Sequence, residues 1–158
     1  MMDAIGLNRH FGIESTAELF SVAGEKVHFT SALRYPVFVD GKNYNGTPDM
    51  LKTEILREMV ETYLAEEARV LRNAVWLPLG PKPVIALKHL CRLGLLKPDQ
   101  ILDGIPHPSG ANAERIAAFL GTKPDGLLSK QTNGRQIAAA RNDLVEKIER
   151  LRTGGLSA

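Results

Sequence analysis

The stretch Ile101-Leu-Asp-Gly-Ile105-Pro-His-Pro-Ser-Gly110 decides the predicted fold, because a short apolar run in it ends at a proline-flanked turn. The run is apolar on both alternating faces, as in a strand that is covered on both sides. Two similar runs precede it, at residues 26–33 and 74–79, and helical patterns separate the three. Strands that alternate with helices are typical of α/β proteins with parallel sheets. The sequence therefore predicts a three-layer α/β fold with a short parallel sheet between helices.

Four helical segments are expected around these runs. The first follows Thr47-Pro48-Asp49 and carries two adjacent apolar stripes at i, i+4 spacing, as in an amphipathic helix. One stripe consists of Leu51, Ile55, Met59, Tyr63 and Val70, and the other of Leu56, Val60, Leu64 and Leu71. The remaining helices are predicted from Pro83 to Gly94, over residues 112–120 with an end at Gly121, and over residues 134–152.

The composition is that of an ordinary globular protein, with 158 residues, 44% hydrophobic residues and 24% charged residues. At about 150 residues per domain, this length predicts a single domain over residues 1–158, in which residues 121–158 form a C-terminal helical extension. The formal net charge is +2. This small excess fits a protein that contacts a few phosphates better than one that coats DNA.

Cysteine usage and hydropathy indicate the cellular context. Cys91 is the one cysteine, which excludes an internal disulfide and a Cys₄ zinc or iron–sulfur site within one chain. No element carries His, Cys or carboxylate pairs at metal-ligand spacing, so no metal and no cofactor are predicted. No apolar run reaches the roughly 18 residues of a membrane helix, and we expect neither a secretion signal nor a membrane partner. These features predict a cytoplasmic protein.

The turn after the third apolar run is the first candidate for chemistry. Ligands of open α/β sheets bind beyond the carboxyl ends of the strands. Pro106 and Pro108 fix φ on both sides of His107, so the imidazole is expected on a stiff backbone. Ser109 or Asn112 is predicted to cap the next helix, whose free N–H groups suit an anion. His107 could then donate a hydrogen bond to charge on a leaving group, or could simply fill space in the turn.

Residues 27–34, 75–80 and 105–110 together resemble the later strands and the final His-Pro-Ser motif of the uracil-DNA glycosylase superfamily. The resemblance covers about residues 2–120 and implies a four-stranded parallel sheet between helices. Such enzymes flip a uracil out of DNA and hydrolyse its glycosidic bond. By this resemblance, His107 is the catalytic residue that stabilises the anionic base at its O2. Pro108, Ser109 and Gly110 would then contact the DNA, with the serine loop in the minor groove.

Two departures from the family pattern modify this expectation. The family places an asparagine in the second strand to read the uracil edge, and here Ser31 matches that position, or Thr30 if the register slips by one. A hydroxyl cannot make the paired donor and acceptor contacts of an amide. The family's first motif, which carries the water-positioning residue, is not found. The coding sequence is thus expected either to begin upstream or to encode a reduced relative that lacks the first strand.

A missing strand would leave unpaired backbone edges, so a reduced relative is expected to pair its remaining strands or to form a homodimer. The first functional hypothesis is a uracil-DNA glycosylase-like hydrolase that acts on uracil or a related damaged base in DNA. The alternatives are a catalytically inactive relative that binds nucleic acid or a nucleotide, and an incomplete domain. DNA is the predicted partner in the first of these hypotheses.

Overall fold

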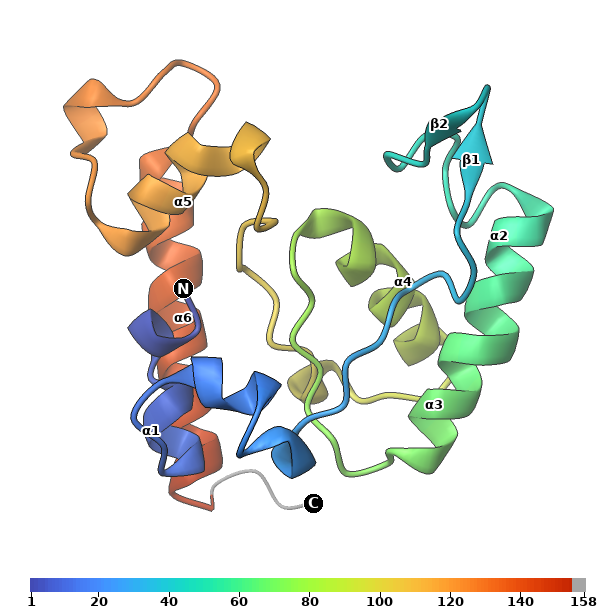
Figure 1. Cartoon of the computed structure of the whole chain (residues 1–158), viewed down its shortest axis with the longest axis horizontal. Helices are drawn as coiled ribbons and strands as arrows, with labels where there is room; N and C mark the ends of the chain where they lie inside the picture. Colours follow the sequence, from blue (N-terminus) through green and yellow to red (C-terminus); the bar gives the residue numbers. More distant parts are fainter. Residues whose placement is uncertain (155–158) are drawn as a thin grey trace. The chain divides into compact units, whose positions relative to one another are not determined.

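The computed structural model describes residues 1–154, which are mainly helical (Figure 1). None of the helices in this range is both long enough and apolar enough to cross a membrane. The chain divides into two compact units, each built from separate stretches of sequence. The terminal unit comprises Met1–His28, Leu77–Pro81 and Leu102–Ala158. The central unit comprises Phe29–Trp76 and Lys82–Ile101.

The central unit contains a small hairpin and two helical layers. Its elements are β1 (Phe38–Val39), β2 (Lys42–Asn43), α2 (Glu54–Met59), the π-helical turn η4 (Val60–Leu64), α3 (Ala65–Val70), α4 (Pro81–Arg92, from Lys82 onward) and η5 (Pro98–Gln100). The strands of the hairpin pair antiparallel, with Phe38 opposite Asn43. The segments α2, η4 and α3 follow one another without a break, so the long helix predicted after Asp49 is confirmed from Glu54 onward.

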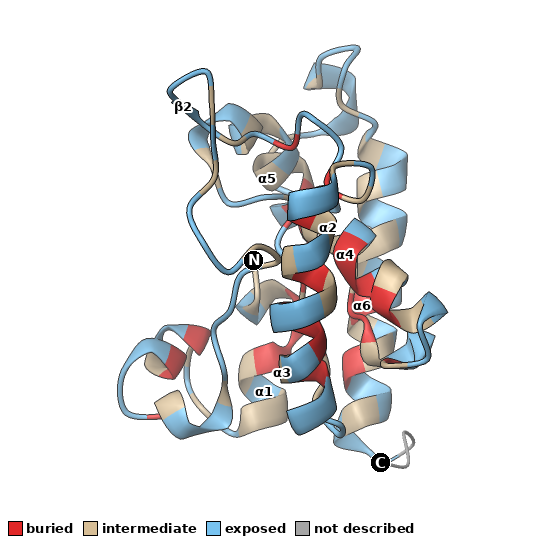
Figure 2. Ribbon diagram, turned by 90° about the vertical axis from the view of Figure 1, so that its right-hand side faces the viewer, coloured by how far each residue is buried: buried red, intermediate tan, exposed pale blue. Residues whose placement is uncertain are grey.

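The core of the central unit is one cluster of buried residues. In Figure 2 the buried residues of α3 and α4 are coloured red. From the long helix the cluster takes Leu56, Val60 and Leu64, the second of the two predicted stripes. In the first stripe, Ile55 and Val70 are exposed instead. Only one stripe of a helix can face a given neighbour. The wide π-helical turn at 60–64 also changes the face of the helix on which the residues after it lie. Full burial of a leucine-sized side chain stabilises the fold by about 1.5–3 kcal/mol.

The terminal unit joins the two ends of the chain. Its elements are η1 (Asp3–Ile5), α1 (Leu7–Phe11), η2 (Thr16–Phe20), η3 (Gly24–Lys26), η6 (Gly110–Asn112), α5 (Ala113–Leu120), η7 (Asp125–Leu127) and α6 (Gly134–Arg152). The long helix α6 contacts α5, α1 and η1, and its residues Leu144 and Ile148 are buried (Figure 1). The predicted extension from residue 121 thus belongs to the terminal unit, except that residues 155–158 lie outside the described residues.

The helix boundaries in the terminal unit follow from local sequence. The predicted helices over 112–120 and 134–152 are confirmed, the first to within one residue. Helix α5 ends at Gly121, whose φ of +72° favours glycine. Helix α6 begins after Asn133, whose side-chain oxygen accepts a hydrogen bond from the Gln136 N–H at 3.1 Å.

The predicted three-layer α/β fold with a parallel sheet, similar to uracil-DNA glycosylases, is wrong. Within residues 1–154, the regular sheet has two strands and both are antiparallel. Residues 27–31 of the first predicted strand belong to no strand or bridge. The second and third predicted strands meet only at isolated parallel bridges, from Trp76 to Ile101 in the central unit and from Leu79 to Ile105 in the terminal unit.

The interruption between these bridges has a local cause. Pro78 has no N–H and cannot donate to a ladder. Gly104, with φ of +127°, leaves the extended region, and the pairing offset changes by one residue from the first bridge to the second. Apolar composition favoured strands here, but these two residues prevent a continuous ladder.

Candidate functional site

His107 is exposed at the end of a short extended segment in the terminal unit. The segment is fixed at its end, because Ile105 is buried and bridges Leu79, and the Gly80 N–H donates to the Ile105 carbonyl at 3.0 Å. After the histidine, the Ser109 N–H donates to the His107 carbonyl at 2.9 Å and closes a tight turn. The exposed His107 therefore lies on a backbone segment that hydrogen bonds hold on both sides.

The predicted cap at the start of the next helix does not form. Neither Ser109 nor Asn112 makes a side-chain capping hydrogen bond. Instead the Asn112 amide donates to the Ser109 hydroxyl at 3.0 Å, and the Asn112 oxygen accepts from the Arg115 guanidinium at 3.1 Å. The two side chains thus satisfy each other, and no side chain among the described residues caps the N–H groups at the start of η6 and α5.

A shallow hollow of about 460 Å³ lies beside the His107 loop. Its lining is mostly apolar and consists of Pro108, Ser109, Gly110, Ala113, Ile116, Ala117, Leu120 and Thr122. The three residues predicted to contact DNA therefore lie together at this hollow. His107 is not among the lining residues, so the hollow begins one residue after the imidazole.

A carboxylate holds the segment that follows α5. Glu114 accepts hydrogen bonds from the Lys123 ammonium and the Thr132 hydroxyl, each at 2.6 Å, and from the Ser129 hydroxyl and N–H. These donors stabilise the charged form and lower the pKa of Glu114 to about 2, with Lys123 the largest contributor. The network fixes residues 123–132 next to Thr122, at one side of the hollow. Nothing in the sequence pattern alone indicated it.

The predicted base-binding residues Thr30 and Ser31 are exposed and belong to the central unit. They line a second hollow of about 350 Å³ together with Phe29 and Arg34. The Arg34 guanidinium donates to the Glu67 carboxylate at 3.2 Å. Phe29 and Arg34 were not among the predicted site residues, although aromatic rings and arginines are common where proteins bind single-stranded nucleic acid.

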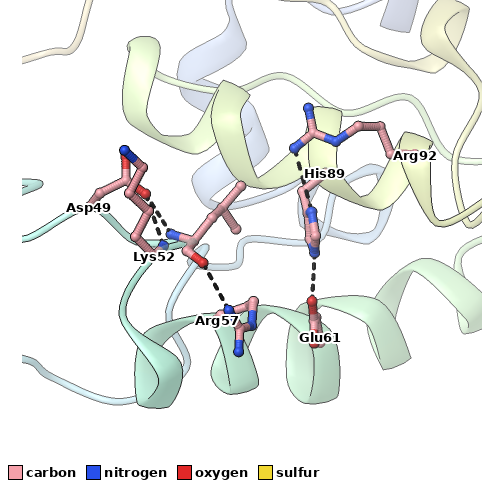
Figure 3. Close-up of polar contacts among 7 residues, drawn as sticks. Asp49, Lys52, Arg57, Glu61, His89 and Arg92 are labelled. Carbon is pink, nitrogen blue, oxygen red and sulfur yellow. Dashed lines mark hydrogen bonds and ion pairs between the residues drawn. The ribbon is translucent and has the colours of Figure 1, made fainter.

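His89 has a structural role in the central unit (Figure 3). Its Nε2 lies 2.7 Å from a Glu61 carboxylate oxygen, and the Arg92 guanidinium donates to its Nδ1 at 3.5 Å. A guanidinium can only donate, so Nδ1 accepts and the Nε2–H donates to Glu61. This pair joins α4 to the turn η4. Within residues 1–154, no group of three His, Cys, Asp or Glu side chains could hold a metal ion.

Comparison with known proteins identifies a similar protein, but that protein has no described activity. No protein-family model matches the chain, and no solved structure matches it. The chain is similar to the uncharacterized protein YoxB of Bacillus subtilis (strain 168), with 36% identity over 149 residues. The match covers 93% of this chain and 57% of the relative, so the chain spans little more than half of the relative's length.

Proposed function

We propose that this chain binds DNA through the His107 loop and acts as a uracil-DNA glycosylase-like hydrolase. Its substrate would be the N-glycosidic bond of a flipped uracil or a related damaged base. One observation carries the proposal: an exposed imidazole stands between two prolines, on a backbone fixed by the Gly80 to Ile105 hydrogen bond, directly before a helix. A cytoplasmic location belongs to the same proposal and agrees with the free thiol of Cys91.

The proposed role of His107 is to stabilise charge that appears during bond cleavage. When the glycosidic bond breaks, the electron pair leaves with the base, and negative charge develops on the uracil O2. An imidazole N–H that donates to this oxygen binds the transition state more tightly than the substrate. A donor that is carried on a fixed backbone needs less reorganisation as the charge develops than one on a mobile loop.

The residues after His107 suit a DNA backbone. Pro108 and Gly110 are exposed, and Ser109 is half-buried at the edge of the hollow. The N–H groups of Asn112 and Ala113 already donate to the Ser109 and Gly110 carbonyls, so in this proposal the phosphate contacts come from the loop residues Pro108 to Gly110 themselves. The base contacts expected of Thr30 and Ser31, with single hydroxyl hydrogen bonds in place of an amide pair, stay a prediction from the sequence.

Binding without catalysis is the second candidate, and a specific observation favours it. Within residues 1–154, no hydrogen bond or ion pair orients the imidazole of His107, and neither hollow is lined by a carboxylate. A hydrolase of this kind needs a group that positions water. The chain would then bind DNA or a nucleotide and leave the bond intact.

The test separates base release from binding. The protein and its His107→Ala variant, purified identically, are incubated with uracil-containing single-stranded and double-stranded oligonucleotides, and alkali then cleaves abasic sites. A His28→Ala variant changes an exposed histidine of the terminal unit that lies outside the His107 loop, and it serves as the control. We expect release by the protein and the control, and release on the order of 10²-fold lower with His107→Ala.

Gel shifts at low and high salt measure binding in parallel. Phosphate contacts predict weaker binding as salt rises, through release of counterions. Salt-dependent binding without release above the His107→Ala level would establish the second candidate. Absence of both binding and release would reject both.

A further inference from the structure

We infer that Gly80 is a positioning residue for His107, which sets the place of the imidazole through direct backbone contact. The inference concerns the geometry of the loop, and only its catalytic consequence rests on the proposed function. Gly80 is buried in the terminal unit, and its backbone lies against the backbone and Cβ of His107. It precedes α4 in the chain, far in sequence from the residue it contacts.

The contact leaves no room for a side chain. A Cβ placed on Gly80 would lie 2.7 Å from the His107 Cβ, 3.2 Å from its Cα and 3.3 Å from its N. Carbon atoms in contact are normally about 3.5–4.0 Å apart. The φ of Gly80 is +98°, which residues with a Cβ rarely adopt. Space and conformation therefore both require glycine here.

Hydrogen bonds on both sides of His107 hold the contact between Gly80 and His107 in place. The Leu79 to Ile105 bridge and the Gly80 N–H bond to the Ile105 carbonyl at 3.0 Å tie residues 79–80 to the segment that leads into His107. On the other side, the Ser109 N–H bond to the His107 carbonyl holds the turn. An added methyl group on Gly80 would have to displace His107 itself, because the atoms it meets are backbone and Cβ.

Other glycines of the described range make different contacts. Gly46 has the same φ of +98°, but a Cβ there would meet the flexible end of the Lys82 side chain. Gly12 has φ of +68° with nothing within 4 Å, and Gly126 has open space and no positive φ. Gly12→Ala therefore measures backbone strain without a clash, and Gly126→Ala measures the change of residue type alone.

The first experiment follows the four histidine imidazoles by NMR, with His107 assigned by its loss in His107→Ala. We expect Gly80→Ala to shift the His107 resonances and to leave those of His10 and His89 in place. Gly12→Ala and Gly126→Ala should leave His107 unchanged. Unchanged His107 resonances in a folded Gly80→Ala protein would overturn the inference.

The second experiment keeps the test valid if Gly80→Ala is too unstable for NMR. The melting temperature is compared for Gly80→Ala alone and together with His107→Gly, which removes the obstructing Cβ. We expect Gly80→Ala to lower the melting temperature less in the His107→Gly background than in the native one. An equal loss in both backgrounds, or failure of both variants to fold while Gly12→Ala folds, would overturn the inference.

A third experiment measures base release and tests whether the position of His107 affects activity. If the protein releases bases, we expect Gly80→Ala to lower kcat by about 10²-fold with little change in KM, since misplacement by about 1 Å has such an effect. An equal effect of Gly12→Ala would contradict positioning. If the native protein releases no base, the proposed function fails, whereas the NMR and melting experiments still decide the role of Gly80.

Discussion

Both compact units of this chain bury apolar side chains, and they differ in the polar contacts that join their segments. In the central unit, apolar side chains form one buried cluster on the long helix and α4, and Leu90 and Val60 in it are fully buried. In the terminal unit, carboxylates join segments distant in sequence. Asp3 accepts from the Thr16 N–H at 2.7 Å, and Glu114 holds residues 123–132. The His107 loop lies in this unit, which adds carboxylate contacts to buried apolar side chains such as Phe119 and Leu102.

This difference predicts opposite responses to pH. In the terminal unit, hydrogen bonds from Thr16 and Ser15 lower the pKa of Asp3, and Lys123 with two hydroxyls lowers that of Glu114. In the central unit, burial raises the pKa of Tyr44 and of Cys91. Acid therefore weakens the terminal unit, because carboxylates whose pKa is lowered in the fold must take up protons. Alkali weakens the central unit, because groups whose pKa is raised in the fold must lose them.

The largest expected effect is a cavity in the central core. Leu90→Ala removes a fully buried side chain and should lower the free energy of unfolding by about 2–5 kcal/mol. Leu93 lies just beyond the same helix and is 50% exposed, so Leu93→Ala is the control, with an expected change within about 0.5 kcal/mol. Urea unfolding measures both. Equal effects of the two substitutions would contradict an apolar core at α4.

Loss of the Glu114 network is expected to act on the terminal unit and to depend on pH. The pKa of Glu114 is about 2 in the fold against 4.5 ordinarily, so its contribution is complete above about pH 4.5 and is lost as pH falls toward 2. Glu114→Gln should lower the melting temperature at pH 7 and show a flatter decline below pH 4.5. Hydrogen exchange should increase over residues 122–133.

Glu146→Gln is the control for this charge change, because Glu146 is exposed on α6 in the same unit. It should leave both the acid decline and the exchange unchanged. A native protein whose melting temperature is constant from pH 5 to 2 would show that the terminal unit does not depend on its carboxylates.

Removal of the Tyr44 hydroxyl should have a smaller effect on the central unit. This hydroxyl donates to the Pro48 carbonyl at 2.7 Å, and its loss in Tyr44→Phe should cost about 1 kcal/mol at pH 7. The raised pKa of Tyr44 means that the native protein loses this contribution as pH rises above about 10, the ordinary value. Tyr44→Phe should therefore match the native protein more closely at pH 11 than at pH 7. A difference that grows with pH would contradict the sign.

The helices could be predicted because their signals are local. Gly121 and Asn133 set boundaries that the structure confirms, and the spacing of Leu56, Val60 and Leu64 marks the buried stripe. The prediction of strands was wrong because an apolar run indicates only that its residues are buried. It does not indicate whether a sheet or helices cover them. Pro78 and Gly104 interrupt a continuous ladder, and both stand within or beside runs that are otherwise apolar. The apolar composition of these runs therefore favoured strands that the two residues prevent.

The site was predictable only in part, for a related reason. Two prolines around His107 are a local constraint, and the exposed turn they predict is present. The predicted helix cap was wrong because the Asn112 amide donates to the Ser109 hydroxyl. The spacing of these residues in the sequence cannot decide whether they bond to each other or to the backbone. The Gly80 contact with His107 joins residues 27 positions apart, so no window of sequence contains it.

The smallest expected effect concerns the His89–Glu61 pair, which tests whether polar contacts matter in the central unit. Its atoms are 2.7 Å apart, with side chains 15% and 39% exposed. A double-mutant cycle with Glu61→Gln and His89→Gln should give a coupling below about 1 kcal/mol, since solvent screens partly exposed pairs. The more exposed Arg69–Glu66 pair is the matched control and should give about 0–0.5 kcal/mol. A His89–Glu61 coupling above about 2 kcal/mol would equal the loss of a core leucine. It would mean that carboxylate hydrogen bonds stabilise both units, and the contrast between them would be lost.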